Sequence, residues 1–256
     1  MEIFNLATAI RTAILRTANL IICLMLGCLV FATSAYATKI QPYDLYYTAD
    51  IGGMKVEARH QLQQIKGQYR VKAQAKNFIG KVTEQGIFEI SESGSIIPLE
   101  YTKHQKTMLG NRSETQIFDW PSKSLMHKEK KTQGKVPISS GQFDRLSLTQ
   151  QMRLDLARGS KKFNYTLIRK GEFKQYQYQV VTTEIINIGK GDYNSLLVER
   201  VEKDSIKKTR IWFALDWDYV ILKMETFEKN SKKTMVLDQG TINGNSILPI
   251  KNRIEI

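Results

Sequence analysis

The sequence predicts an all-β protein with one inserted helix, in which a curved antiparallel sheet forms a half-open or a closed β-barrel. Apolar and polar residues alternate with a period of two along most of the chain after residue 42, which is typical of strands with one buried face. Short turns containing glycine separate several of these stretches, as in antiparallel hairpins. The alternation changes once, at about residues 144–158, to the spacing of a helix.

The first predicted hairpin shows the alternation clearly. Tyr43, Leu45 and Tyr47 fall on one face of its first strand, and the residues between them fall on the other. Gly52-Gly53 follows and fits a two-residue turn, because glycine tolerates the positive φ that such turns require. The partner strand then presents one largely apolar face made of Met54, Val56, Ala58, His60 and Leu62.

Further strand-like stretches bring the total to about a dozen. They cover residues 69–75, 83–91, 96–107, 113–120, 125–130, 163–167, 176–188, 193–201, 209–215, 220–228 and 233–242. Residues 134–141 form the one irregular stretch long enough for a mobile loop. Because no segment rich in proline or glycine divides the chain, residues 38–256 are predicted to be a single β-barrel-like domain.

The predicted helix interrupts the strands at about residues 144–158. Ser147 and Gln150 fit a capping box, and Gly159 is a plausible end point. Its apolar residues lie on two faces, with Leu148, Met152 and Leu156 on one side and Leu146 and Leu154 on the other. A helix with two apolar faces is usually covered on both, so we expect it inside the mouth of a curved sheet.

Residues 1–37 have the organisation of a cleaved secretory signal peptide. Arg11 and Arg16 precede an apolar run at residues 20–31, shorter than the ~20 residues that a membrane-spanning helix needs. The small residues of Ala35-x-Ala37 then fit signal peptidase, so we predict cleavage near Ala37 and a periplasmic location. Two alternatives are an uncleaved membrane anchor and lipid attachment at Leu26-Gly27-Cys28; the short run disfavours the first, and the apolar residues after Cys28 disfavour the second.

The chain is basic, with 38 Lys and Arg against 25 Asp and Glu and a formal net charge of +13. The signal peptide holds Glu2, Arg11 and Arg16, so the exported chain keeps +12 (13 minus 1). An exported basic protein meets an anionic envelope surface rather than nucleic acid. The same lysines also suit the solvated faces of strands, so both interpretations stay open.

No motif for catalysis or for a cofactor is present. The chain has no G-x-S-x-G elbow, no P-loop and no G-x-G-x-x-G after a strand. His60, His104 and His127 are far apart and show no metal-ligand spacing. Both cysteines, Cys23 and Cys28, fall in the signal peptide, so the exported chain has no thiol. We therefore predict a protein that is not an enzyme, without catalytic residues, metal or cofactor.

Four segments of the chain share their order and spacing with a known family. They are Phe118-Asp119-Trp120, residues 144–148 continuing through Gln151 and Arg153 to Leu156, residues 197–201, and residues 209–214 leading to Tyr219, Val220 and Glu225. Together they resemble a family of exported bacterial proteins, domain of unknown function 3108. The resemblance extends from about Pro42 to Gln239, and it implies a periplasmic β-rich domain with no assigned catalytic residues. The turn near residues 215–220 lacks prolines that the family often has. The overall plan is also similar to the half-open barrels of periplasmic lipoprotein carriers.

The leading functional hypothesis is a non-catalytic periplasmic protein that binds an apolar or amphipathic, lipid-like ligand, with the basic exterior docked on an anionic envelope surface. Arg210 is in phase with Trp212, so an inward arginine would neutralise an anionic headgroup. The candidate ligand-binding residues are Tyr47, His60, Tyr69, Arg210 and Trp212.

Two other functions stay open. The first is an envelope assembly or interaction scaffold whose barrel is filled by its own side chains. The second is a hydrolase of envelope polymers that uses a carboxylate pair, for which Glu84 with Glu89 and Asp216 with Asp218 are the candidates. The sequence specifies neither the ligand nor the oligomeric state.

Overall fold

The computed structural model describes residues 40–250 except 109, 130–131, 202–206 and 230. The predicted signal peptide, its cleavage site near Ala37 and both cysteines lie outside the described residues. Within the described part of the chain, no helix combines the length and apolar character needed to span a membrane.

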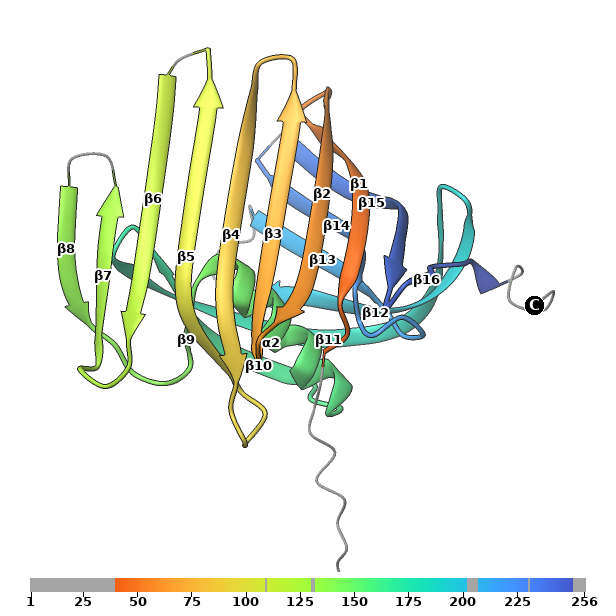
Figure 1. The fold of residues 1–256 in the computed structure, drawn as a ribbon. Coiled ribbons are helices and arrows are strands. Elements are labelled where there is room, and N and C mark those ends of the chain that lie inside the picture. The colour runs from red at the N-terminus through yellow and green to blue at the C-terminus, as the bar shows by residue number, and fades with distance from the viewer. Residues whose placement is uncertain (1–39, 109, 130–131, 202–206, 230, 251–256) are drawn as a thin grey trace, which may run out of the picture. The chain divides into compact units, whose positions relative to one another are not determined.

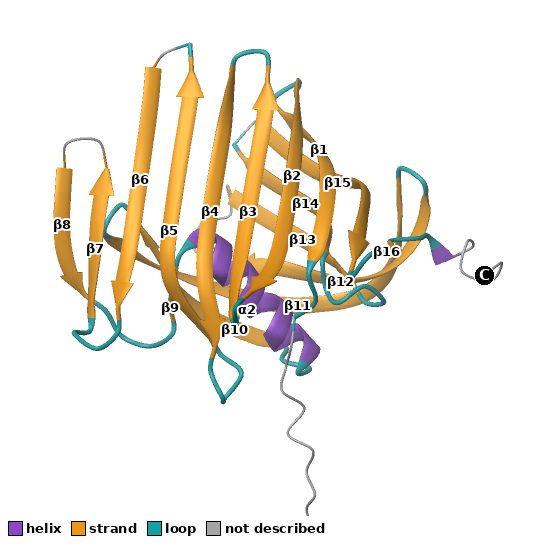
Figure 2. Ribbon diagram, in the orientation of Figure 1, coloured by secondary structure: helices purple, strands orange, loops and turns teal. Residues whose placement is uncertain are grey.

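The described residues form one sixteen-stranded sheet and one helix (Figures 1 and 2). In chain order the elements are β1 (Tyr43–Ile51), β2 (Met54–Ile65), β3 (Gln68–Asn77), β4 (Gly80–Ile90), β5 (Ile96–Thr107), β6 (Gly110–Asp119), β7 (Ser124–Glu129), β8 (Thr132–Pro137), β9 (Gln142–Phe143), α2 (Arg145–Ala157), β10 (Lys162–Arg169), β11 (Glu172–Ile188), β12 (Gly191–Val201), β13 (Lys207–Ala214), β14 (Ile221–Glu228), β15 (Ser231–Ile242) and β16 (Asn245–Ser246).

The sheet is a curved meander that does not close. Its order is β8-β7-β6-β5-β4-β3-β2-β1-β15-β14-β13-β12-β11-β10-β9, with β16 beside β15. All pairs are antiparallel except the short β9–β10 pair. The path ends at β8 and β9, which do not pair with each other in the described residues, so the front wall and the back wall in Figure 1 share strand pairing only along β1 and β15. On the other side they meet through side chains: Gln116 of β6 donates to the Ile168 carbonyl of β10 (3.3 Å), and Ile168 packs with Phe118 and Leu125. The predicted fold class is confirmed, and of its two forms the open one is present.

Four register shifts help to curve the sheet. They lie at Tyr46/Tyr47, Ile87/Phe88, Val180/Thr182 and Trp212/Phe213. A bulge adds a residue to one strand of a pair, which bends that strand and increases the local twist. A long sheet with several bulges therefore wraps around a core instead of lying flat.

The first hairpin has the predicted turn, because Gly52 and Gly53 both have positive φ (+64° and +86°) and Ile51 pairs with Met54. The loop predicted at residues 134–141 is partly wrong. Thr132–Pro137 forms the edge strand β8, which pairs with β7 through Leu125 and Val136. The sequence pattern missed this strand because it has no regular apolar face; its pairing with β7 creates it.

The helix lies where it was predicted, but its cap differs. Asp144, not Ser147, is the N-cap, and its side chain accepts hydrogen bonds from the backbone N–H of Leu146 (2.8 Å) and Ser147 (3.0 Å). The Ser147 hydroxyl donates back to the Asp144 carbonyl (3.2 Å). Gly159, with φ +79°, follows the last helical turn as expected.

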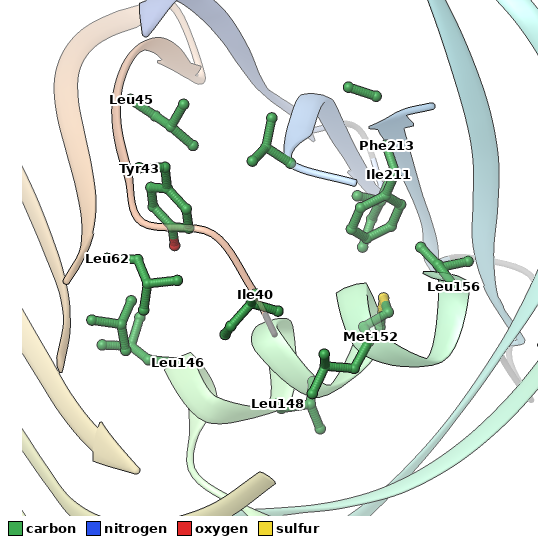
Figure 3. Close-up of a cluster of buried hydrophobic side chains, with 14 of the residues drawn as sticks. Ile40, Tyr43, Leu45, Leu62, Leu146, Leu148, Met152, Leu156, Ile211 and Phe213 are labelled. Carbon is green, nitrogen blue, oxygen red and sulfur yellow. The ribbon is translucent and has the colours of Figure 1, made fainter. Parts of the chain in front are cut away.

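The helix lies in the concave side of the sheet, and its apolar side chains are part of the main core (Figure 3). Figure 3 shows Leu146 pointing toward Leu62, and Met152 and Leu156 on the side of Ile211 and Phe213. Both predicted apolar faces are buried, since Leu146, Leu148, Met152, Leu154 and Leu156 are each at most 7% exposed. The helix therefore fills the inner side of the sheet rather than lining an empty barrel.

Candidate functional site

A groove of about 720 Å³ lies beside the helix, at the open seam of the sheet. The β4–β5 turn, the start of β5, the residue that follows β6, the loop before β9, β9 itself, the strand β10 and one side of α2 contribute to it. The seam exists because the sheet path ends at β8 and β9. Open sheets bind ligands where the fold leaves a concave gap between elements.

The apolar wall of the groove consists of Ile96, Ile97, Trp120, Phe143 and Tyr165. Trp120 stacks on Phe118 with ring centroids 5.9 Å apart, and its indole N–H donates to the Pro98 carbonyl (2.6 Å). Phe143 meets Tyr165 edge to face at 5.9 Å. These contacts hold the rings in one arrangement, so the wall is preorganised for an apolar group.

The polar base of the groove is centred on the Asp155 carboxylate of the helix. It accepts hydrogen bonds from the Tyr165 hydroxyl (2.8 Å) and the Gln151 amide (3.0 Å). Arg158 pairs with it at 3.5 Å. Burial and the neighbouring Asp155 raise the pKa of Tyr165, so its hydroxyl stays a neutral donor. Gln151 also accepts the Ile96 N–H (2.7 Å), which ties the base to the wall.

Hydroxyl groups form the rim. Ser91 and Ser93 share a hydrogen bond of 2.8 Å, and the Ser91 hydroxyl accepts the Ser95 N–H (3.0 Å). Ser140 and Asn164 also line the groove, and both are exposed. The groove thus combines an aromatic wall, a satisfied carboxylate base and an uncharged polar rim.

Three of the predicted site residues belong to the concave side of the sheet but not to this groove. The Tyr47 ring meets the His60 ring edge-on at 5.3 Å, and its hydroxyl donates to the Ile221 carbonyl (2.9 Å). Burial, with Arg145 as a second cause, lowers the pKa of His60 to about 4, so its imidazole is neutral at neutral pH. Tyr69 stacks on Phe88 at 5.4 Å.

The other two predicted residues lie on the opposite face of the sheet, which corrects the expectation that Arg210 points inward. Ile211 and Phe213 of β13 are in the core, so alternation places Arg210 and Trp212 on the other side. Arg210 Nε donates to Glu199 (2.7 Å). The Trp212 indole N–H donates to Glu184 (2.6 Å), and Lys223 lies 4.8 Å from its ring centroid. The five residues therefore do not form one site.

The candidate carboxylate pairs also have separate partners. Glu84 is buried against Lys103 and Arg145 (3.3 Å each), whereas Glu89 accepts from Gln68. Asp216 accepts from Asn194 (2.9 Å), whereas Asp218 binds Arg153 (2.6 Å). In the described residues, no group of three or more His, Cys, Asp or Glu side chains is placed to hold a metal ion.

Sequence reasoning missed a buried polar cluster around Arg153, which is 2% exposed. Its guanidinium donates to the Asp218 carbonyl (3.0 Å) and carboxylate (2.6 Å) and to the Gln150 amide oxygen (2.7 Å). Gln150 in turn donates to the Tyr43 hydroxyl (3.0 Å). The sequence feature that could have revealed this cluster is the pair Gln150 and Arg153, which lie three residues apart on a helix otherwise rich in leucine.

The family model for a protein of unknown function, DUF3108, matches residues 42–238. The chain belongs to this family. The matched range agrees with the resemblance seen in the sequence, and it includes the helix, the Arg153 cluster and the groove residues of β4 to β10. No curated protein matches this DUF3108 member.

One solved structure supports the fold. A β-barrel-like protein of the DUF1849 domain from Brucella abortus has a TM-score of 0.54 and 9% sequence identity, covering 80% of this chain and 98% of that one. At this identity the likeness concerns the fold alone. A presumed lipoprotein from Parabacteroides distasonis, with a TM-score of 0.29 and 11% identity over 78% of this chain and 95% of that one, is too dissimilar to support any conclusion.

The helix cap of this DUF3108 member carries a buried carboxyl group. Asp144 is fully buried, and burial raises its pKa to about 6 although backbone and Ser147 hydrogen bonds oppose the shift. Its Oδ2 atom has no hydrogen-bond partner in the described residues. The folded protein therefore holds this proton more tightly than the unfolded chain, whose aspartate pKa is about 3.9.

We expect Asp144→Asn to become more stable relative to the wild type as pH rises. Between about pH 4 and pH 6 the contribution of Asp144 to wild-type stability falls with rising pH, because the folded state binds the Asp144 proton and the unfolded state has released it. Asparagine also caps helices but does not ionise. The difference in unfolding free energy, measured by urea titration, should grow by about 2–3 kcal/mol across this window. His60 titrates in both proteins, so its effect cancels in the difference between their unfolding free energies. A difference that does not change with pH would contradict a raised pKa for Asp144.

Proposed function

We propose that this protein is a non-catalytic, periplasmic protein that binds an amphipathic, lipid-like ligand in the groove beside α2. The groove carries the proposal: its volume of about 720 Å³ lies in the range typical of small-molecule sites, and its wall is aromatic. An acyl chain would pack on Trp120, Phe143 and Tyr165. A polar head would meet the hydroxyl rim.

The filled interior shapes this proposal. In half-open barrels that carry lipids, an inner cavity is the expected site, but α2 occupies the inner side of this sheet with five buried apolar side chains. Beside the helix, aromatic side chains and polar groups line one open groove together. A ligand at the seam also leaves the Arg153 cluster intact.

A substitution that fills the groove tests the proposal. We expect Ser140→Trp to weaken binding of a single-chain lysophospholipid about tenfold, because a large ring would occupy the space for the chain. Ser139→Trp is the matched control, since Ser139 is exposed in the same loop but does not line the groove. The ligand-induced rise in melting temperature, measured below the micellar concentration, reports binding.

Two results would contradict the proposal. One is that no lysophospholipid raises the melting temperature of the wild type; the other is that both tryptophan variants bind equally well. Mass spectrometry of the protein purified from its native envelope adds an independent measurement, since a bound amphiphile would co-purify with the wild type and in a smaller amount with Ser140→Trp.

An interaction scaffold is the second candidate, and the filled interior favours it. The β8 edge adds support, because Thr132–Pro137 pairs only with β7 in the described residues and leaves backbone groups for a partner strand. Under this alternative, cross-linking in cells from a photoreactive residue at exposed Lys135 would capture a protein, and neither tryptophan variant would alter the yield.

A further inference from the structure

Two neighbouring hairpin turns expose large apolar side chains at one end of the front wall. In the β3–β4 turn Phe78 is 86% exposed, and at the β5–β6 turn Met108 is 84% exposed. The next most exposed large apolar residue in the described part of the chain is Ile185, at 64%. Figure 1 shows both turns at the upper end of the wall formed by β3 to β6.

The two turns are held side by side. The Met108 N–H donates to the Ile79 carbonyl (3.3 Å), and Gly80 pairs with Thr107. A Cβ at Gly80 would lie 2.5 Å from the Lys106 carbonyl oxygen, so only glycine allows this close approach. Phe78 and Met108 therefore belong to one tip, which we call the hairpin tip (Phe78, Ile79 and Met108).

The fold itself does not require an apolar residue at Phe78. Asn77 holds the turn, because its side-chain oxygen accepts the N–H groups of Ile79 and Gly80 (3.1 Å each). Turn positions this exposed are usually polar. Exposed apolar side chains on adjacent turns are typical of surfaces that meet a partner or a membrane.

Basic residues lie directly behind the hairpin tip. Lys81 and Lys106 face each other across β4 and β5, and Arg112 follows on β6. These three cations have no ion-pair partner in the described residues, although Lys76 nearby pairs with Glu57 (3.1 Å). They line a shallow hollow of about 610 Å³ that contains His104, Ser113 and no acidic residue. The apolar tip and its basic border match an anionic lipid surface.

We propose that this protein docks on an anionic bilayer through the hairpin tip. Phe78 and Met108 insert among the lipid headgroups, and Lys81 and Lys106 contact the lipid phosphates. This inference goes beyond the groove, which lies at the other end of the same strands: β4 begins at Gly80 by the tip and ends next to Ser91 at the groove rim. A docked protein therefore keeps the groove clear of the membrane contact.

Flotation with vesicles tests the proposal. The purified protein should bind vesicles of phosphatidylethanolamine with phosphatidylglycerol, and bind poorly when phosphatidylcholine replaces phosphatidylglycerol. The double variant Phe78→Ser/Met108→Ser should lose about tenfold in partitioning. Its matched control is Met126→Ser/Ile185→Ser, which removes two other exposed apolar side chains and should bind like the wild type.

A second pair of variants tests the charge. Lys81→Gln/Lys106→Gln should lose about fivefold per lysine on anionic vesicles, and the loss should vanish at high salt. Lys162→Gln/Lys190→Gln, which removes two exposed lysines elsewhere, is the control. Melting temperatures of all variants establish that they fold.

Several outcomes would overturn the proposal. One is that the tip variant still binds vesicles, and another is that the Met126/Ile185 control loses as much binding as the tip variant. A third is that the wild type does not bind vesicles but self-associates without lipid, and that the tip variant abolishes this self-association. The last outcome would assign the tip to a second copy of the chain. Lysophospholipid binding in the groove is expected to be unchanged in the tip variant, so the two proposals can fail separately.

Discussion

Replacing Arg153 with methionine is expected to lower the free energy of unfolding by about 3 kcal/mol or more. Methionine approximates the length of the arginine stem but makes none of its hydrogen bonds to Asp218 and Gln150. Asp218 would keep only the Gln41 N–H (2.9 Å) among these contacts, and its carboxylate is only 21% exposed. A largely buried charge without its partner costs more than the pair contributes when intact.

The Arg153 cluster also holds the β13–β14 turn. Asp218 and Tyr219 both have positive φ (+48° and +51°), a conformation that non-glycine residues adopt at a cost. The two hydrogen bonds from Arg153 to Asp218 compensate for that cost by tying the turn to the helix. The loss in Arg153→Met therefore includes the release of the turn.

Urea unfolding measures the effect, and a double-mutant cycle isolates the pair. Asp218→Asn removes the unpaired charge, so Arg153→Met/Asp218→Asn should be less destabilised than the sum of the two single variants. Arg70→Met is the control, because Arg70 is exposed and should change stability by no more than about 0.5 kcal/mol. Additive effects would show that the two side chains are not coupled.

Met152→Ala and Leu154→Ala should each destabilise the protein by about 2–5 kcal/mol, although the two residues lie on opposite sides of α2. Met152 is 2% exposed and Leu154 is 1% exposed. Each truncation leaves a cavity in a core that packs against both faces of the helix, and the surrounding sheet cannot collapse fully into it.

Thermal and urea unfolding of the two variants provide the measurement. Thr149→Ala is the control on the same helix, because Thr149 is only partly buried and its hydroxyl bonds within the helix (3.3 Å to the Arg145 carbonyl). A large loss for one truncation and a negligible loss for the other would mean that the helix lies on a surface, with one face open.

Much of the fold could be predicted because it follows from local patterns. Residues alternate from Tyr43 to Ala49, and the strand they form has one face buried against the core; Gly52-Gly53 then turns the chain as expected. The helix could be placed because the spacing of its apolar residues differs from the period of two seen in the strands. The edge strand β8 could not be predicted, because it has no regular apolar face and forms only through its hydrogen bonds to β7.

The candidate site was harder to predict than the fold. Arg210 and Trp212 alternate with Ile211 and Phe213, and both sets contain large side chains, so the pattern did not say which set faces the core. The groove residues Trp120, Phe143 and Tyr165 are far apart in the chain. They meet because the sheet stops at β8 and β9 and α2 lies beside the seam.

The sequence by itself determined the all-β class, the inserted helix and the family, because period, turn residues and motif order are local properties of the chain. Only the tertiary structure decided that the sheet stays open, that α2 fills its inner side, and that Phe78 and Met108 share one exposed tip. The reason is physical: which strand edges pair, which faces are buried and which turns become neighbours depend on contacts between residues distant in the chain, and no local pattern records them.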